Sequence, residues 1–76
     1  MKIILQFLYN KDKTYKLDID DETIGDVKQR LYMNECIPSG QQKYFYKNEE
    51  LKDDKKVIDY GVRDNHIIYF TFNLKG

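Results

Sequence analysis

The sequence predicts an α+β fold in which one helix lies across a mixed β-sheet, and three observations predict it. Residues 2–20 combine an apolar run with a strictly alternating run on the two sides of a polar turn. Residues 23–34 carry apolar side chains at helical spacing, and a second alternating run occupies residues 66–73. This order of elements indicates a single domain over residues 1–76.

The first predicted element is a β-hairpin. Residues 2–8 are rich in apolar and β-branched types, which favour a strand. Residues 9–13 are polar, and Asn10 and Asp12 tolerate the backbone conformations of a turn. From Thr14 the alternation is strict, with Tyr15, Leu17 and Ile19 on one face and Lys16, Asp18 and Asp20 on the other. This pattern predicts a half-buried second strand.

The helix is predicted from about Thr23 to Asn34, before Pro38. Thr23 followed by Asp26 resembles a capping box, although Asp is shorter than the usual Glu. After the helix we expect a strand over residues 43–46, a turn over residues 48–50 and a last strand from His66. The predicted core is Ile3, Leu5, Tyr15, Leu17, Ile19, Ile24, Val27, Leu31, Tyr44, Leu51, Val57, Val62, Ile68 and Phe70.

The bulk composition argues against nucleic acid or a membrane as the partner. Thirteen acidic and thirteen basic residues give a formal net charge of zero, so no overall field attracts a polyanion. The apolar start of the chain is too short for a signal peptide or a membrane span. Cys36 is the only cysteine, so no internal disulfide forms, which is compatible with the cytosol or the nucleus.

Little in the sequence suggests catalysis, a metal or a cofactor. Cys36 and the single histidine, His66, would form a nucleophile–base pair only if the fold joined them. No Cys/His cluster has metal-ligand spacing, and no Gly-rich loop is suited to phosphate. Seven tyrosines interleaved with lysines allow RNA stacking, but the zero net charge favours packing in the core and on the sheet. We therefore expect a non-enzymatic protein.

A series of short motifs follows a definite order along the chain. The middle reads Ile37-Pro38-Ser39-Gly40-Gln41-Gln42-Lys43, followed by Leu51-Lys52-Asp53 and Val57-Ile58-Asp59-Tyr60. The end reads Leu74-Lys75-Gly76, while Met1-Lys2-Ile3 and Thr23-Ile24-Gly25-Asp26-Val27-Lys28 fit the same pattern near the start. In this order, and with these gaps, the motifs resemble ubiquitin over the whole chain.

The resemblance implies the β-grasp topology, in which the first and last strands pair in parallel at the sheet centre. It also implies that the buried Tyr60 hydroxyl bonds to backbone in the preceding loop, and that residues 73–76 form a flexible tail. The first hairpin is two residues longer than in ubiquitin. Cys36 stands where ubiquitin has the glycine that ends its helix, so either Cys36 adopts left-handed geometry at a cost of roughly 1 kcal/mol or the helix ends differently.

The resemblance further implies surfaces that bind proteins of the ubiquitin–proteasome system, such as receptors, ligases, and activating or conjugating enzymes. The positions that match ubiquitin's main apolar patch are Leu8, Phe45, Tyr69 and Thr71. A second expected patch comprises Leu8, Ile37, Phe72 and Leu74, and Ile4 is a further exposed apolar candidate. Around the patches the expected rim is Lys43, Lys47 and Glu49, which is less basic than the rim of ubiquitin and selects different partners.

Two functional hypotheses follow from the resemblance. The favoured one is a monomeric interaction domain that docks on ubiquitin-pathway receptors or the proteasome, because Glu49 and Asp64 replace ubiquitin's two main linkage lysines. The alternative is a free modifier that is conjugated to target lysines through the tail Leu74, Lys75 and Gly76, as the length, Met1 and the terminal glycine suggest. Lys11 and Lys28 are then the candidate acceptor lysines for chains.

Overall fold

The structure, a computed structural model, describes residues 1–72. The predicted tail, with Leu74, Lys75 and Gly76, lies outside the described residues. The elements, in chain order, are β1 (Lys2–Phe7), β2 (Thr14–Asp18), α1 (Ile24–Glu35), the 3₁₀ turn Ser39–Gln41, β3 (Gln42–Tyr46), β4 (Glu49–Glu50), the 3₁₀ turn Val57–Tyr60 and β5 (His66–Phe72).

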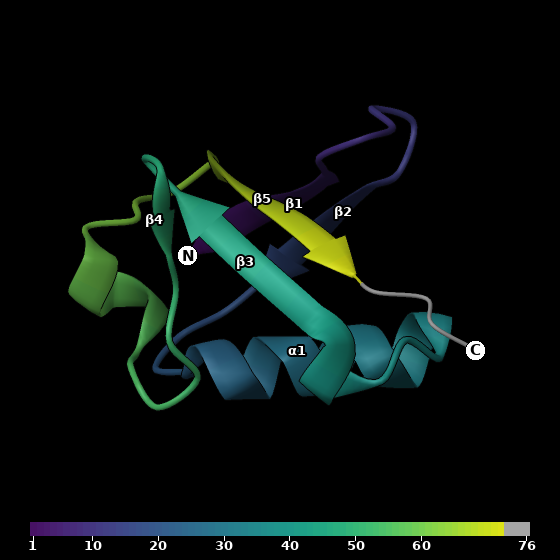
Figure 1. Cartoon of the computed structure of the whole chain (residues 1–76). Coiled ribbons are helices and arrows are strands. Elements are labelled where there is room, and N and C mark those ends of the chain that lie inside the picture. Colours follow the sequence, from purple (N-terminus) through teal and green to yellow (C-terminus); the bar gives the residue numbers. More distant parts are fainter. Residues whose placement is uncertain (73–76) are drawn as a thin grey trace.

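The five strands form one mixed sheet in the order β2-β1-β5-β3-β4. β1 pairs antiparallel with β2 and parallel with β5, so the first and last strands lie side by side in the middle of the sheet (Figure 1). α1 crosses one face of the sheet, and the other face is left open (Figure 1). The predicted α+β fold with β-grasp topology is therefore confirmed.

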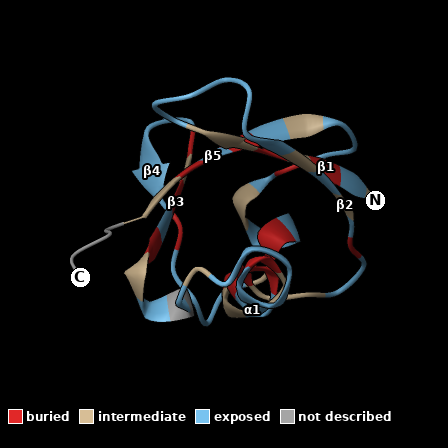
Figure 2. Ribbon diagram, turned by 90° about the vertical axis from the view of Figure 1, so that its right-hand side faces the viewer, coloured by how far each residue is buried: buried red, intermediate tan, exposed pale blue. Residues whose placement is uncertain are grey.

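The core lies between the sheet and α1, where the buried parts of the ribbon face one another (Figure 2). Twelve of the fourteen residues predicted for the core are buried. Tyr15 and Leu17 are the exceptions, because β2 is an edge strand and its inward side chains are only half-buried. Tyr46, which was not predicted, is buried as the last inward side chain of β3.

Both ends of α1 follow local sequence rules. At the start, the Thr23 hydroxyl accepts a hydrogen bond from the Asp26 N–H, and the Asp26 carboxylate accepts one from the Thr23 N–H, each at 3.1 Å. The predicted capping box is therefore present. At the end, Cys36 adopts left-handed geometry with φ 59°, and its N–H donates to the Tyr32 carbonyl at 2.7 Å. Of the two alternatives for the helix end, the left-handed geometry at Cys36 is thus the one found.

The turn predicted over residues 48–50 is wrong by one position. Lys47 and Asn48 form the turn, with φ 52° and 66°, and Glu49 and Glu50 form β4 opposite Tyr46 and Phe45. A two-residue hairpin loop with positive φ at both positions is the type I′ turn, which matches the twist of its strands. Two adjacent glutamates are not typical of a β-strand, but Glu49 and Glu50 form one because their backbone pairs with β3.

The hydrogen bond expected for Tyr60 is present, although its side chain is half-buried instead of fully buried. The Lys52 N–H donates to the Tyr60 hydroxyl at 2.8 Å. This bond ties the end of the 3₁₀ turn Val57–Tyr60 back to the loop after β4, which carries Leu51 into the core.

Candidate functional site

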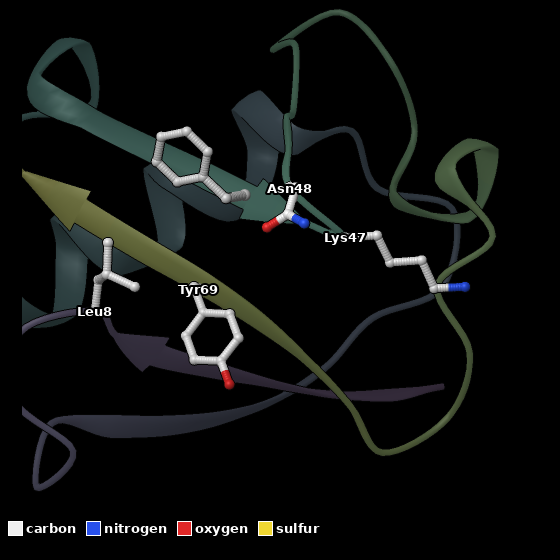
Figure 3. Close-up of a pocket in the computed structure, with 5 residues that line it drawn as sticks. Leu8, Lys47, Asn48 and Tyr69 are labelled. Atoms are coloured by element: carbon white, nitrogen blue, oxygen red, sulfur yellow. The ribbon is translucent and has the colours of Figure 1, made fainter.

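An open hollow of about 460 Å³ lies on the outer face of the sheet, opposite α1. Its lining residues come from three parts of the chain (Figure 3): Leu8, Phe45, Lys47, Asn48 and Tyr69. The structure thus brings together Leu8, Phe45 and Tyr69, three of the four residues predicted for the main apolar patch.

Strand alternation explains why Phe45 and Tyr69 point outward. In β3 the neighbours of Phe45 are Tyr44 and Tyr46, and both are buried on the helix side. β5 follows the same rule, because Ile68 and Phe70 point inward on either side of Tyr69. Phe45 is the direct register partner of Tyr69, so their side chains share the outer face.

Leu8 reaches the hollow from the segment after β1. Its N–H donates to the Phe70 carbonyl at 3.0 Å, which extends the pairing with β5 by one residue. The Leu8 side chain is 48% exposed and that of Tyr69 is 40% exposed. Two such side chains beside the half-buried Phe45 form an apolar surface that a partner can cover.

Thr71, the fourth predicted patch residue, belongs to a neighbouring hollow. It pairs with Lys43, one outward position along β5 from Tyr69. This second hollow measures about 260 Å³ and is lined by Tyr9, Gln41, Lys43, Thr71 and Phe72. Tyr9 was missed in the sequence, although it is 78% exposed and contacts Phe7 edge-on with 5.8 Å between ring centroids. The signal was the apolar pair of Leu8 and Tyr9 directly before the polar turn.

The predicted rim residues differ in their distance from the hollow. Lys47 lines it, and its Nζ lies 5.4 Å from the centroid of the buried Tyr46 ring. Lys43 lines the neighbouring hollow, while Glu49 lies on β4 opposite Tyr46. Within residues 1–72, none of these three side chains forms an ion pair. Asn48, which also lines the hollow, was predicted only as a turn residue.

The described residues of the second predicted patch lie in different surroundings. Phe72 stacks on Phe7 with ring centroids 4.8 Å apart, and Ile37 packs half-buried against the core. Leu8 lines the outer hollow instead, and Leu74 lies outside the described residues. Ile4 is half-buried, whereas its register partner Ile67 is exposed.

The structure does not favour Lys28 as an acceptor lysine. Its side chain points inward from α1, is only 6% exposed, and places Nζ 2.6 Å from the Asp53 carboxylate. An amine that is buried and hydrogen-bonded is not a free nucleophile. The predicted acceptor Lys28 therefore occupies a structural position, whereas the other predicted acceptor, Lys11, is exposed in the β1–β2 loop.

The structure gives Cys36 and His66 separate surroundings. Cys36 is an exposed residue at the end of α1, whereas the His66 Nδ1 lies 2.7 Å from the Tyr46 hydroxyl. Among residues 1–72, no three His, Cys, Asp or Glu residues gather in a way that would hold a metal ion. The same part of the chain contains no helix with the length and apolar character of a membrane span.

Comparison with known proteins agrees with the fold. Residues 3–75 match the family described as the ubiquitin family. The chain belongs to the ubiquitin family. Members of this family are typically non-catalytic. The chain is a ubiquitin-like domain with the β-grasp fold.

The similar proteins are of two kinds. The ubiquitin domain-containing protein DSK2a of Arabidopsis thaliana is 33% identical over 51 residues, which are 67% of this chain and 10% of that protein. Ubiquitin-like protein 1 of Schizosaccharomyces pombe is 29% identical over 65 residues, 84% of this chain and 83% of its own length. The ubiquitin-like protein NEDD8 of Dictyostelium discoideum is 28% identical over 65 residues, 84% of each chain. The chain therefore spans a tenth of the first relative but most of the other two.

Proposed function

We propose that this ubiquitin-like domain is a protein-interaction domain that docks on receptors of the ubiquitin pathway or on the proteasome. The observation that carries the proposal is the outer hollow, where Leu8, Phe45 and Tyr69 converge from three segments. Its occupant is a protein segment with an apolar side chain that covers Phe45.

The chemistry of the hollow supports a protein partner. Phe45 and Tyr69 lie directly opposite each other, and aromatic side chains are typical anchors of protein interfaces. Lys47 at one end of the hollow and Lys43 in the neighbouring hollow supply positive charge at the rim. Rim charge selects partners and speeds encounter more than it adds affinity.

Thr71 and the second patch extend this surface in the proposal. Thr71 brings a hydroxyl beside Tyr9 and Phe72, so a partner that covers this region must supply a hydrogen bond. The described residues of the second patch, Leu8, Ile37 and Phe72, would form an accessory contact for ligases or other enzymes of the pathway. We expect the domain to act in the cytosol or nucleus, in the reducing surroundings that its unpaired Cys36 suits.

The test is a titration of the ¹⁵N-labelled chain with the isolated ubiquitin-binding domain of a proteasomal receptor. Because the hollow is small, we expect a dissociation constant on the order of micromolar or weaker. The largest shifts should fall on Leu8, Phe45, Lys47 and Tyr69. Shifts that cluster instead on the outward face of α1, around Gln29 and Met33, would show that the site is wrongly placed.

A second candidate function is that of a conjugated modifier. It is favoured by the similarity to Ubiquitin-like protein 1 and NEDD8, which covers 84% of this chain and 83% and 84% of theirs. Asn73 stands where ubiquitin has an arginine, and it cannot make the charge-assisted hydrogen bonds of a guanidinium. We therefore expect poor thioester formation with ubiquitin's activating enzyme and ATP, and efficient formation would favour the modifier.

A further inference from the structure

The strand β2 forms one edge of the sheet, so only one of its two sides is paired with another strand (Figure 2). The Phe7 N–H donates to the Lys13 carbonyl at 2.9 Å, which fixes the residues of this segment that bond to β1. In an antiparallel pair, successive residues direct their backbone groups alternately toward the partner strand and away from it. The N–H and carbonyl groups of Thr14 and Lys16 therefore point away from β1.

Arg30 closes this edge at the end of β2. The Asp18 carbonyl also points away from β1, and it accepts a hydrogen bond from the Arg30 guanidinium at 2.9 Å. The Glu22 carboxylate holds the same guanidinium at 2.9 and 3.0 Å. Within residues 1–72, no other backbone group bonds to the outward groups of Thr14 or Lys16. Two donors and two acceptors are thus left for water or for another strand.

The side chains along the edge combine apolar surface with positive charge. A hollow of about 230 Å³ is lined there by Lys2, Lys16, Leu17 and Asp18. Leu17 is half-buried, so part of its side chain is open at the edge. Both lysines are exposed, and in the part of the chain that the structure describes neither forms an ion pair. Asp18 lies 3.4 Å from the terminal ammonium of Met1, which offsets its negative charge.

We propose that the free edge of β2 binds an extended segment of a partner protein as an antiparallel sixth strand. The outward groups of Thr14 and Lys16 supply the hydrogen bonds, and strand alternation decides the side chains of the segment. Acidic side chains lie beside Lys2 and Lys16, and the apolar side chains between them lie beside Tyr15 and Leu17. Because β1 separates β2 from β5, this surface is distinct from the outer hollow and does not rest on the proposed function.

A second copy of the chain fits this edge poorly. The antiparallel register that pairs the free groups of two copies sets Thr14 opposite Lys16 and brings two basic edges together. Lys11 and Lys13 in the adjoining turn are exposed as well, so like charges would face one another. Charged side chains on an edge strand disfavour such self-pairing. A segment with acidic side chains meets the opposite charge instead.

The experiment that decides the proposal adds a capped heptapeptide of alternating valine and glutamate to the ¹⁵N-labelled chain. In the free chain, the amide protons of Thr14 and Lys16 should exchange with water faster than those of Tyr15 and Leu17, which β1 protects. With the peptide at about ten times its dissociation constant, exchange at Thr14 and Lys16 should slow by about tenfold, because only the unbound chain exchanges. Unchanged exchange at these two amides at the highest soluble peptide concentration would overturn the proposal.

Two altered peptides test the backbone pairing and the charge separately. N-methylation of the glutamates removes the N–H groups that face Lys16 in an antiparallel pair, and it should abolish the protection. Replacement of the glutamates by lysine keeps the backbone and should weaken binding by about fivefold or more. Equal binding of the N-methylated peptide would contradict strand addition, and equal binding of the lysine peptide would contradict the assigned charge.

A charge reversal in the chain provides a matched pair of variants. Lys16→Glu keeps the strand backbone and should reverse the preference, so that the lysine peptide binds more tightly than the glutamate peptide. The control Lys55→Glu changes the net charge equally at an exposed residue between β4 and the 3₁₀ turn Val57–Tyr60. It should keep the wild-type preference. If both variants prefer the same peptide, Lys16 does not select the segment and the proposal is wrong.

The same spectra distinguish this edge from the other possible sites. Peptide-induced shifts confined to Leu8, Phe45 and Tyr69 would place the peptide in the outer hollow, which would overturn the edge and leave the proposed function standing. Shifts at Thr14 and Lys16 that appear when the chain alone is concentrated would assign the edge to a second copy and would also overturn the proposal. Peptide-induced shifts centred on β2 support it, even if the receptor domain does not bind the outer hollow.

Discussion

Phe45 on β3 lies directly opposite Tyr69 on β5, and both side chains point to the sheet face that α1 leaves open. Each residue stands between buried neighbours in its own strand, so its outward direction follows from the same packing that builds the core. The aromatic pair is therefore presented by rigid strands. Leu8, by contrast, comes from the segment that follows β1.

Replacement of Phe45 by alanine should weaken binding to a receptor domain by at least tenfold, because the ring is the most enclosed apolar group of the hollow. A central aromatic anchor is typically worth about 2 kcal/mol or more, which exceeds a factor of ten. Isothermal titration of wild type and Phe45→Ala would measure the change.

The matched control for Phe45→Ala is Met33→Ala, because Met33 is 75% exposed on α1, which covers the opposite face of the sheet. This variant should bind like the wild type, and both variants should retain cooperative unfolding. Equal affinities of the wild type and Phe45→Ala would contradict the assigned hollow.

Replacement of Tyr44 by phenylalanine should lower the free energy of unfolding by about 1–3 kcal/mol. The buried Tyr44 hydroxyl donates to Gln42 Oε1 at 2.8 Å, and Gln42 Nε2 donates to the carbonyls of Lys28 and Ile37 at 3.0 and 2.9 Å. Without the hydroxyl, a buried amide oxygen loses its donor. Urea unfolding would measure the loss, and an unchanged midpoint would contradict this role of the hydroxyl.

Stability should also fall in alkali because of Tyr44. Burial, with a smaller effect from the Asp53 carboxylate, raises the pKa of the Tyr44 hydroxyl well above its usual value of 10.0. A tyrosine in the unfolded chain ionises near pH 10, so its contribution is complete below that pH and is lost as the pH rises. The slope contributed by one group reaches about 1.4 kcal/mol per pH unit. Urea unfolding at about pH 9 and about pH 11 should show a smaller fall for Tyr44→Phe than for the wild type.

Replacement of Tyr60 by phenylalanine should cost about 1–2 kcal/mol, since the Lys52 N–H would lose its acceptor at 2.8 Å. The half-buried ring leaves some access for water, so the lower end of the range is expected. The denaturant midpoints of the wild type and Tyr60→Phe would measure this loss of stability. Identical midpoints would mean that water replaces the hydroxyl without cost.

Most of the fold could be predicted because the local patterns agree with one another. An apolar, β-branched run marks β1, period-two runs mark β2 and β5, and the Thr23–Asp26 box marks the start of α1. The parallel pairing of β1 with β5 came from the resemblance alone, since alternation within a strand says nothing about its neighbours. β4 was missed because its two glutamates pair with β3 through the backbone, which leaves no side-chain pattern. The backbone pairing continues at Leu51, whose N–H donates to the Tyr44 carbonyl at 2.8 Å.

The candidate site was predictable where it depends on strands and less so where it depends on loops. Leu8, Phe45 and Tyr69 were predicted to form one surface, and they line one hollow. Tyr9 lies outside any periodic run, so only the structure shows it beside Phe72. The Tyr46–His66 contact joins residues 20 positions apart, and no short-range pattern encodes such a pair.

The burial of Lys28 could not be read from the sequence either, because its partner Asp53 is 25 positions away. This pair gives the last prediction. Asp53→Asn should destabilise the fold, since it leaves a buried ammonium without its counter-charge, and because the Asp53 side chain is 65% exposed we expect a loss of about 1–2 kcal/mol. Brief acetylation of the native chain with mass-spectrometric mapping should modify Lys11 early and Lys28 last among the described lysines. The order should change in Asp53→Asn, where the Lys28 ammonium has lost its counter-charge. If Lys28 in the wild type is acetylated as fast as Lys11, its amine is free, and its role as an acceptor for conjugation must be restored.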